Sequence, residues 1–160
     1  MAKSITLFIL FFGLCVANGF SQSQKVAPRD AKTLCDRVVE IKQLPHHYDE
    51  RGVDAAYDAL AEAGEAVIPC LIEKNTDTKI MRDPRCPTIS TETKVADVAY
   101  FVLVGIAKIG FVELFPADVQ EKYKTEGVYA YHDYIEQKGK REELQAKLRE
   151  WYQKRQNAKI

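Results

Sequence analysis

The sequence has no excess of charge of either sign. Its 160 residues contain 23 Lys and Arg against 23 Asp and Glu, so the formal net charge is zero. Nucleic-acid-binding proteins normally carry a marked basic excess, and the balance argues against that class of partner. Hydrophobic residues make up 46% of the chain and charged residues 29%. This mix is typical of a globular protein, and the length favours a single domain.

Recognisable catalytic motifs are also missing. The chain contains no HExxH, CxxC, GxSxG or GxGxxG, so no strong signature of an active site is present. Gly105 and Gly110 have the spacing of a P-loop start, but Phe111 and Val112 replace the Lys and the Ser or Thr that contact phosphate. We interpret these glycines as core packing and expect neither an enzyme nor a cofactor.

Histidine is scarce, with three residues in the whole chain. His46 and His47 precede Tyr48, Asp49 and Glu50, and the group offers metal-ligand chemistry. Adjacent side chains point in different directions on a regular helix or strand, so a chelate would need a tailored loop. We therefore interpret the group as a solvated turn without a metal. The third histidine, His132, is expected to be partly exposed and structural.

The first hydrophobic run is too short to cross a bilayer. It extends from Ile5 to Val16, whereas a spanning helix needs about 20 residues. Lys3 precedes the run and small residues follow it, which is the pattern of a secretory signal peptide. We expect cleavage after Gly19 and a periplasmic or secreted product. Cleavage after Ala17 or Ser21, and an uncleaved anchor, are the alternatives.

Three cysteines follow this leader: Cys35, Cys70 and Cys86. Export favours a compartment where disulfides persist, and an odd number permits at most one bond among them. Cys35 and Cys70 have apolar neighbours, so we interpret both as small buried core residues. Cys86 lies in a Pro-bounded stretch with arginines that favour a thiolate. It is either a reactive thiol or the partner of Cys70, and the sequence does not choose.

Apolar residues recur at helical spacing along most of the chain. The pattern predicts helices over about 30–42, 53–63, 69–75, 95–109, 117–124, 128–137 and 140–156. Segment 95–109 is apolar all round and should be the central buried helix, with a strand or a short membrane span as alternatives. We predict a compact all-α domain of six or seven helices over 30–160, after a flexible lead-in at 20–29.

Charge is uneven along this predicted domain. The segment 46–75 is acidic and the segment 137–160 is basic. We interpret both as solvated helix faces, and a basic helix that meets an acidic partner is the alternative. In the last predicted helix, Leu144, Leu148 and Trp151 form an apolar stripe. This stripe should dock on the core, with Trp151 as a packing anchor.

Residues 76–93 form the longest stretch without a helical pattern. Loops of this length are uncommon in compact domains and are often functional. We therefore propose Arg82, Asp83 and Arg85 as a binding surface for another protein. Cys86, in the same stretch, is the candidate reactive thiol.

Two segments resemble a known architecture. DAAYDALAEAGEAVIPCLIEKNTDT, at 54–78, combines two helices and a short turn, and KVADVAYFVLVGIAKIG, at 94–110, resembles the start of a second unit. Together, residues 54–110 resemble the helical hairpins of HEAT-like repeats, which implies stacked helices that present a face to protein partners. The long loop at 76–93 departs from the tight link of that family. The DPR triplet at 83–85, with KVADVAYF and KTEGVYAY, also resembles a group of small exported bacterial proteins of uncharacterised function.

These features favour an exported, non-catalytic protein-binding module of the bacterial envelope. The export signal, the HEAT-like helices and the missing catalytic motifs support it. One alternative is an immunity protein that neutralises an envelope-targeted toxin. Another is an enzyme that uses Cys86 or the His46–Asp49 cluster.

Overall fold

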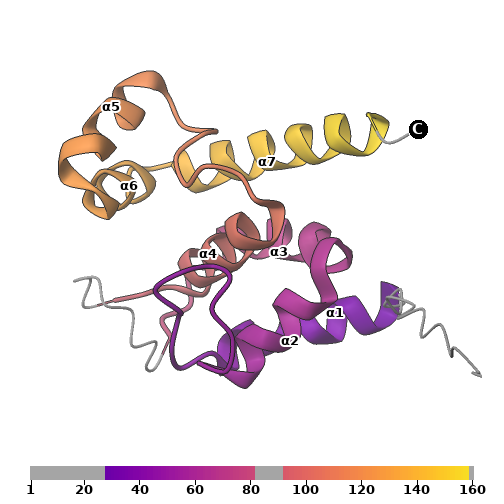
Figure 1. The fold of residues 1–160 in the computed structure, drawn as a ribbon. Helices are drawn as coiled ribbons and strands as arrows, with labels where there is room; N and C mark the ends of the chain where they lie inside the picture. The colour runs from indigo at the N-terminus through magenta and orange to yellow at the C-terminus, as the bar shows by residue number, and fades with distance from the viewer. Residues whose placement is uncertain (1–27, 82–91, 159–160) are drawn as a thin grey trace, which may run out of the picture.

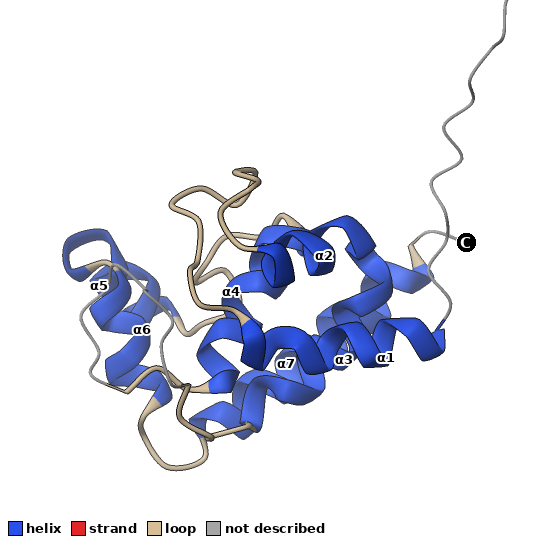
Figure 2. Cartoon of the chain, turned by 90° about the horizontal axis from the view of Figure 1, so that it is seen from below, coloured by secondary structure: helices blue, strands red, loops and turns tan. Residues whose placement is uncertain are grey.

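The computed structural model describes residues 28–81 and 92–158, and the regular elements in these ranges are helical (Figures 1 and 2). The α-helices are α1 (Pro28–Asp36), α2 (Ala55–Ala63), α3 (Ile68–Glu73), α4 (Val95–Ala107), α5 (Ala117–Glu126), α6 (Val128–Ile135) and α7 (Lys140–Asn157). Short 3-10 helices directly follow the first three: η1 (Arg37–Glu40), η2 (Gly64–Val67) and η3 (Lys74–Thr76). The described residues form no strand, and an isolated antiparallel bridge pairs Ile80 with Lys94. The predicted all-α class is therefore confirmed.

The N-terminal boundary differs from the prediction. The expected leader, residues 1–19, lies outside the described residues, as does most of the expected lead-in at 20–29. Helix α1 begins at Pro28, two residues before the predicted start, because proline suits a first turn. Asp30 consequently lies within the first turn instead of capping it. The helix ends at Asp36 and tightens into η1, so the predicted continuation to residue 42 is wrong.

Helix α4 is the buried centre of the fold, as its all-round apolar sequence predicts. Val98, Tyr100 and Leu103 have no exposed surface, and α2, α3 and the three 3-10 helices all pack against this helix. Full burial of one large apolar side chain contributes about 1.5–3 kcal/mol. The helix ends two residues early, where Lys108 takes a left-handed φ of 56°. No helix in the described ranges is both long and apolar enough to cross a membrane.

Helix α2 begins at Ala55 because Asp54 caps it. One carboxylate oxygen of Asp54 accepts the backbone N–H groups of Ala56 at 2.9 Å and Tyr57 at 3.1 Å, and the other accepts that of Lys42 at 2.9 Å. Burial alone would raise the pKa of Asp54, but the hydrogen bonds from these N–H groups outweigh it and lower the pKa below its ordinary value. The side chain thus joins the helix start to the segment after η1.

Replacing Asp54 by Ala is expected to lower the free energy of unfolding by about 1–2 kcal/mol, the range observed for a lost helix cap. Because the folded pKa is lowered, this stabilisation is present above the unfolded pKa and disappears as pH falls through the folded value. Urea unfolding of the wild type and of Asp54→Ala at neutral and acid pH measures this stabilisation. The difference in free energy of unfolding between the two proteins should be smaller at acid pH. Asp118→Ala, an exposed first-turn carboxylate in α5, should change stability by less than about 0.5 kcal/mol. Equal effects of the two changes would contradict the capping role.

Helix α7 contacts the acidic segment 46–75 of the same chain. The Gln145 side-chain amide donates to the carbonyl oxygens of Ile72 at 3.0 Å and Glu73 at 3.1 Å, and Arg149 pairs with the Glu73 carboxylate at 2.6 Å. Arg155 donates to the Ala107 carbonyl and pairs with Glu65 at 2.7 Å. The two oppositely charged segments are therefore partly paired with each other, a role that the expectation of purely solvated faces missed.

The apolar stripe of α7 docks on the core as predicted. Leu144 and Leu148 are buried, while Trp151 is only partly buried and packs at the edge of the core. The guanidinium of Arg155 lies 5.4 Å from the centre of the Trp151 ring. Trp151 is therefore a peripheral packing contact, and Leu148 is the more central residue.

Helices α5 and α6 form a separate pair at one end of the molecule (Figures 1 and 2). Gly127 joins them with a φ of 59°, a conformation that glycine adopts without a steric penalty. Among the described helices, only α7 brings its backbone close to this pair. Between α6 and α4 the space is instead bridged by aromatic side chains, and this arrangement creates the pocket described below.

Candidate functional site

The residues proposed from the sequence as a binding surface lie outside the described residues. Arg82, Asp83, Arg85 and the candidate thiol Cys86 all belong to 82–91. Of the described part of 76–93, Thr76 belongs to η3 and the remaining residues form no helix, as the sequence predicts, but backbone hydrogen bonds pair the two flanks. The Met81 N–H donates to the Thr93 carbonyl at 2.8 Å, and the Val95 N–H donates to the Lys79 carbonyl at 2.9 Å.

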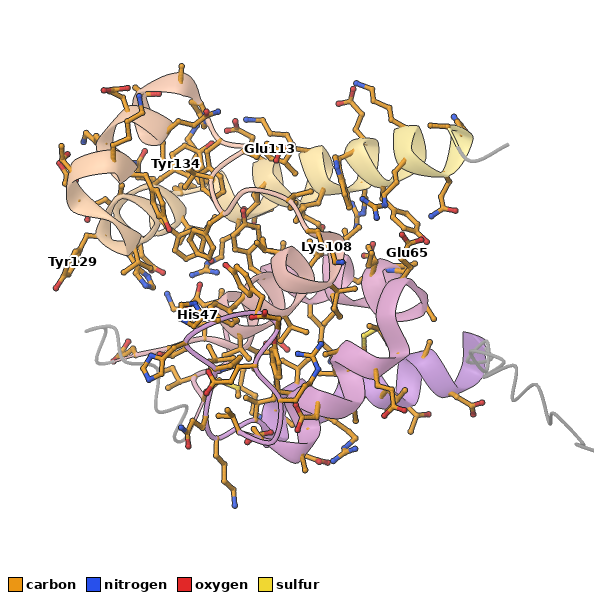
Figure 3. All side chains as sticks on the ribbon, viewed as in Figure 1. His47, Glu65, Lys108, Glu113, Tyr129 and Tyr134 are labelled. Atoms are coloured by element: carbon orange, nitrogen blue, oxygen red, sulfur yellow. A yellow bond between two sulfur atoms is a disulfide. The ribbon has the colours of Figure 1, made fainter. Side chains whose placement is uncertain are left out.

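The histidine cluster of the first loop is a turn on the surface. His46, His47, Asp49 and Glu50 are all exposed, and His47 is labelled in Figure 3. Glu50 accepts the backbone N–H of His46 at 3.0 Å, so its carboxylate stabilises the turn. Within the described ranges, no group of three or more His, Cys, Asp or Glu side chains is placed to hold a metal ion.

A pocket of about 360 Å³ lies between the loop 41–54, α4 and the α5–α6 pair. We call it the aromatic pocket, because its walls carry the rings of Tyr48, Phe101, Phe111, Tyr123, Tyr131 and His132. Most of these rings are only partly buried, so their faces are available to a ligand. Pockets of 300–1,000 Å³ with apolar walls and a few polar groups are the usual form of a small-molecule site.

Aromatic packing explains why the pocket exists. The Tyr131 ring on α6 stacks on Tyr100 of α4 with ring centres 5.4 Å apart, and it also contacts Phe111 and Phe115. The Tyr100 hydroxyl donates to the Phe111 carbonyl, which fixes the chain after α4. Rings of this size hold the α5–α6 pair away from α4. The space beside them is the aromatic pocket.

The carboxylate in the pocket wall is neutralised from within the protein. Asp97 accepts hydrogen bonds from the Tyr131 hydroxyl at 2.9 Å, from Arg141 at 2.9 Å and from the backbone N–H of Lys94 at 2.9 Å. Arg141 also pairs with Glu136 at 2.7 Å. Burial would lower the pKa of Arg141, but Asp97, Tyr131 and Glu136 together outweigh burial and raise it. The Arg141 guanidinium is therefore charged and bound to the carboxylates of the protein itself.

Tyr48 forms part of the wall of the aromatic pocket, and hydrogen bonds to its backbone carbonyl hold it in place. Its carbonyl oxygen accepts hydrogen bonds from the Tyr57 hydroxyl and from Arg51, both at 2.9 Å. Its ring lies 4.8 Å from that of Phe101. Burial raises the pKa of Tyr48, and the nearby Tyr123 and Tyr57 raise it further. Its hydroxyl therefore stays protonated and can donate a hydrogen bond into the pocket.

Gly105 permits this close approach. A Cβ atom at position 105 would lie 2.7 Å from the Tyr48 ring. Gly105 thus serves packing, as the sequence suggested, and its specific role is to seat Tyr48. Gly110 is exposed, so the expectation of core packing is wrong for it. The sequence did not identify Tyr48, Phe101, Phe111 or Tyr123 as site residues. The high density of aromatic residues in 100–134 is the sequence feature that could have indicated this site.

Gly105→Ala is expected to destabilise the fold by about 1–3 kcal/mol, the cost of overpacking. The sign of this change in the free energy of unfolding is informative, because alanine normally stabilises a helix by up to about 1 kcal/mol relative to glycine. Urea unfolding followed by circular dichroism measures the change. Gly110→Ala is the control, since its added Cβ would meet its nearest neighbour at an ordinary 3.5 Å. A Gly105→Ala protein as stable as the wild type would show that Tyr48 does not lie on this glycine.

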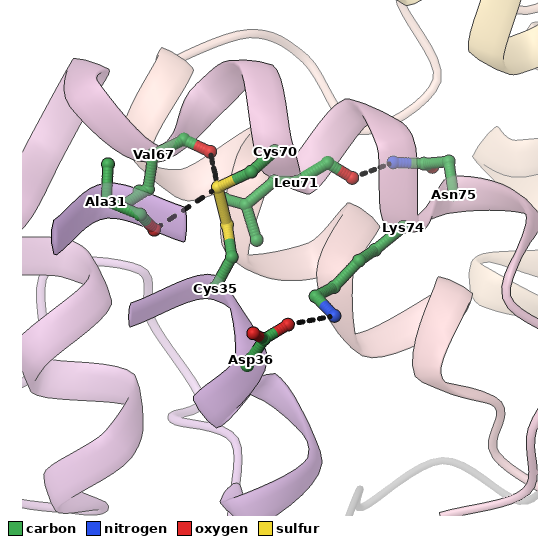
Figure 4. The surroundings of a disulfide bond; sticks show 8 residues. All are labelled: Ala31, Cys35, Asp36, Val67, Cys70, Leu71, Lys74 and Asn75. Carbon is green, nitrogen blue, oxygen red and sulfur yellow. Dashed lines mark hydrogen bonds and ion pairs between the residues drawn. A yellow bond between two sulfur atoms is a disulfide. The ribbon is translucent and has the colours of Figure 1, made fainter. Parts of the chain in front are cut away.

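A disulfide joins α1 to α3 (Figure 4). It links Cys35 and Cys70, whose Cα atoms are 6.2 Å apart. Cys35 is buried, whereas Cys70 is partly exposed. The expectation of a buried core residue is therefore confirmed for Cys35 and wrong for Cys70, which is only partly buried. The alternative that pairs Cys70 with Cys86 is wrong. An ion pair of 3.1 Å between Lys74 and Asp36 adds a second link at the same place.

Comparison with known proteins adds no family to this description. No family model, no curated protein and no solved structure matches the chain. The HEAT-like resemblance of residues 54–110 thus stays a prediction, and the function has to be argued from the aromatic pocket itself.

Proposed function

We propose that this chain is an exported, non-catalytic binding protein and that the aromatic pocket is its binding site. The observation that supports this proposal is a 360 Å³ pocket whose walls combine six rings from five segments of the chain. Partly exposed rings at the meeting point of several elements are costly to maintain in water and favourable once covered by a ligand.

The polar groups of the pocket support binding over catalysis. Asp97 is engaged by three donors, and its pair with Arg141 would have to break before it could accept a proton from a substrate. The remaining polar side chains of the wall include Thr93, His46 and His132. These groups can orient a bound molecule by hydrogen bonds.

Export is the second part of the proposal. The leader pattern at residues 1–19 supports it, and the Cys35–Cys70 disulfide is of the kind that persists in oxidising compartments. Mass spectrometry of protein purified from a bacterial envelope fraction tests it. The expected product begins at residue 20, and full-length protein confined to the cytoplasm would contradict export.

A protein partner of the envelope is the sequence-based part of the proposal. Its expected contacts, Arg82, Asp83 and Arg85, lie outside the described residues. Affinity capture from envelope extract is expected to recover a specific protein, and less of it when Arg82 and Arg85 are both replaced by Ala. Capture equal to background, or equal for both forms, would contradict this part.

A large side chain introduced into the aromatic pocket tests whether this pocket is the binding site. Val128 of α6 lines the pocket, whereas its neighbour Tyr129 is 47% exposed and projects outward (Figure 3). We expect Val128→Trp to abolish ligand binding and Tyr129→Trp to preserve it.

Thermal unfolding in the presence of a chemically diverse small-molecule library provides the measurement. A ligand at ten times its Kd stabilises the folded state by about 1.4 kcal/mol, which raises Tm by about 4–8 °C. Hits shared by the wild type and Tyr129→Trp but lost in Val128→Trp would support the proposal. No hits, or hits that survive Val128→Trp, would refute this pocket as the binding site.

A further inference from the structure

We propose that the aromatic pocket binds a small neutral molecule with one aromatic ring and a hydrogen-bonding group, for which a simple phenol is representative. This inference rests on the proposed function and adds the chemical class of the ligand. Three features of the pocket carry it: the placement of the rings, the balance of charge and the position of the polar groups.

The rings of the pocket belong to two groups. Tyr48 and Phe101 contact each other at 4.8 Å between ring centres. Phe111 contacts both Tyr123 at 5.7 Å and Tyr131 at 5.3 Å. Within the described residues, no ring contact joins the first group to the second. A single aromatic ring placed between them can contact both groups, at the 4.5–7 Å separations that aromatic pairs prefer.

The volume and enclosure of the pocket favour a small molecule. About 360 Å³ is near the lower end of the range for ligand sites, enough for a compact molecule and too little for a multi-ring cofactor. The loop 44–48, α4 and α6 all contribute to the wall, so a small ligand would be contacted from several elements at once.

The charges around the pocket favour a neutral ligand. Asp97 is paired with Arg141, and Glu136 is paired with both Arg141 and Lys94. Two acidic and two basic groups thus balance beside the wall. A charged ligand would lose its hydration without gaining a free counter-charge, which is unfavourable. An aromatic cage for a cation is disfavoured for the same reason, because Arg141 already occupies the carboxylate.

Polar groups at the pocket can position one hydrogen-bonding substituent. Thr93 and His46 lie in the wall, and the Tyr48 hydroxyl remains a donor over the physiological pH range. A ligand hydroxyl can both donate to and accept from such groups. A ring without a polar substituent would leave them unpaired when it displaced water, so a phenol should bind more tightly than toluene.

Five probes test the chemical class. Four of them are compact: 4-methylphenol, its saturated analogue 4-methylcyclohexanol, the cation benzyltrimethylammonium and the anion 4-methylbenzoate. The fifth is the larger blocked amino acid N-acetyltyrosinamide. Titration of the isotope-labelled full chain, followed by the NMR methyl signals of Val98 and Val128, gives the Kd of each probe. We expect 4-methylphenol to bind at least about tenfold more tightly than the saturated alcohol.

Each outcome decides for or against the inference. Tightest binding of 4-methylphenol, lost in Val128→Trp and kept in Tyr129→Trp, supports it. Tightest binding of the cation, the anion or the saturated alcohol overturns the ligand class while leaving the pocket as a binding site. Tightest binding of N-acetyltyrosinamide identifies the occupant as a side chain of a protein partner and overturns the free-molecule assignment. If no probe binds but the library yields pocket-dependent hits, the inference fails and the proposed function stands.

Discussion

Replacing Asp97 by Ala is expected to lower the free energy of unfolding by about 3–5 kcal/mol, the cost of breaking a buried ion pair by removing one partner. Asp97 and Arg141 have side-chain exposures of only 9% and 8%, and their atoms lie 2.9 Å apart. The change would take from Arg141 the more buried of its two carboxylate partners, Asp97 and Glu136, and remove the acceptor of the Tyr131 hydroxyl. It would also release the backbone N–H of Lys94 at the start of α4. Urea unfolding measures the loss.

A double-mutant cycle measures the coupling free energy between Asp97 and Arg141 separately from their contacts with other residues. Arg141→Met is expected to cost a similar amount, because Asp97 is then buried without its counter-charge. The double variant should be clearly more stable than the sum of the single losses predicts, because no unpaired charge remains. Glu121→Ala is the control, since Glu121 and its partner Lys124 are both exposed and such pairs contribute about 0–1 kcal/mol. Strictly additive losses would contradict a coupled buried pair.

The sequence predicted the helices better than the site because helices follow from local patterns. The all-round apolar run at 95–109 identified the central helix, and the predicted end of the second helix at residue 63 agrees with the end of α2 before Gly64, which has a positive φ. Side chains that act across the chain were missed. Asp54 caps the start of α2 and also accepts the backbone N–H of Lys42, a contact that periodicity does not encode.

The aromatic pocket depends on contacts between distant segments. Tyr48 reaches Phe101 from a loop more than fifty positions earlier, and Tyr131 reaches Asp97 and Tyr100 from another helix. The sequence placed Tyr48 in a predicted solvated turn and Asp97 within the predicted central helix. Both residues in fact line one hollow. Identification of such a site requires the tertiary arrangement of α4 and α6.

Pairing of charges between distant segments also requires the tertiary structure. Composition showed an acidic and a basic segment, but not that they meet. Arg149 with Glu73 and Arg155 with Glu65 show that part of this asymmetry is satisfied within the molecule. The basic C-terminal helix therefore has fewer free charges for an external acidic partner than its sequence implies.

Removal of the disulfide should produce a loss of comparable size. Replacing Cys35 and Cys70 together by Ala is expected to lower the free energy of unfolding by about 3–4 kcal/mol, because the bond closes a loop of 35 residues and restricts the unfolded chain. Alanine is preferred to serine, since Cys35 is buried and a hydroxyl there would need a new partner. Unfolding in urea, with and without dithiothreitol, measures the effect.

The reductant provides the decisive comparison. Dithiothreitol should lower the stability of the wild-type chain to that of the double variant, and it should leave the double variant itself unchanged. Cys86→Ala should respond to the reductant like the wild type, because the Cys35–Cys70 bond does not involve Cys86. A wild-type midpoint that is insensitive to complete reduction, verified by thiol counting, would show that the link between α1 and α3 adds nothing to the packing around Val67 and Leu71. In that case the apolar contacts of the buried helices alone would hold α1 in place.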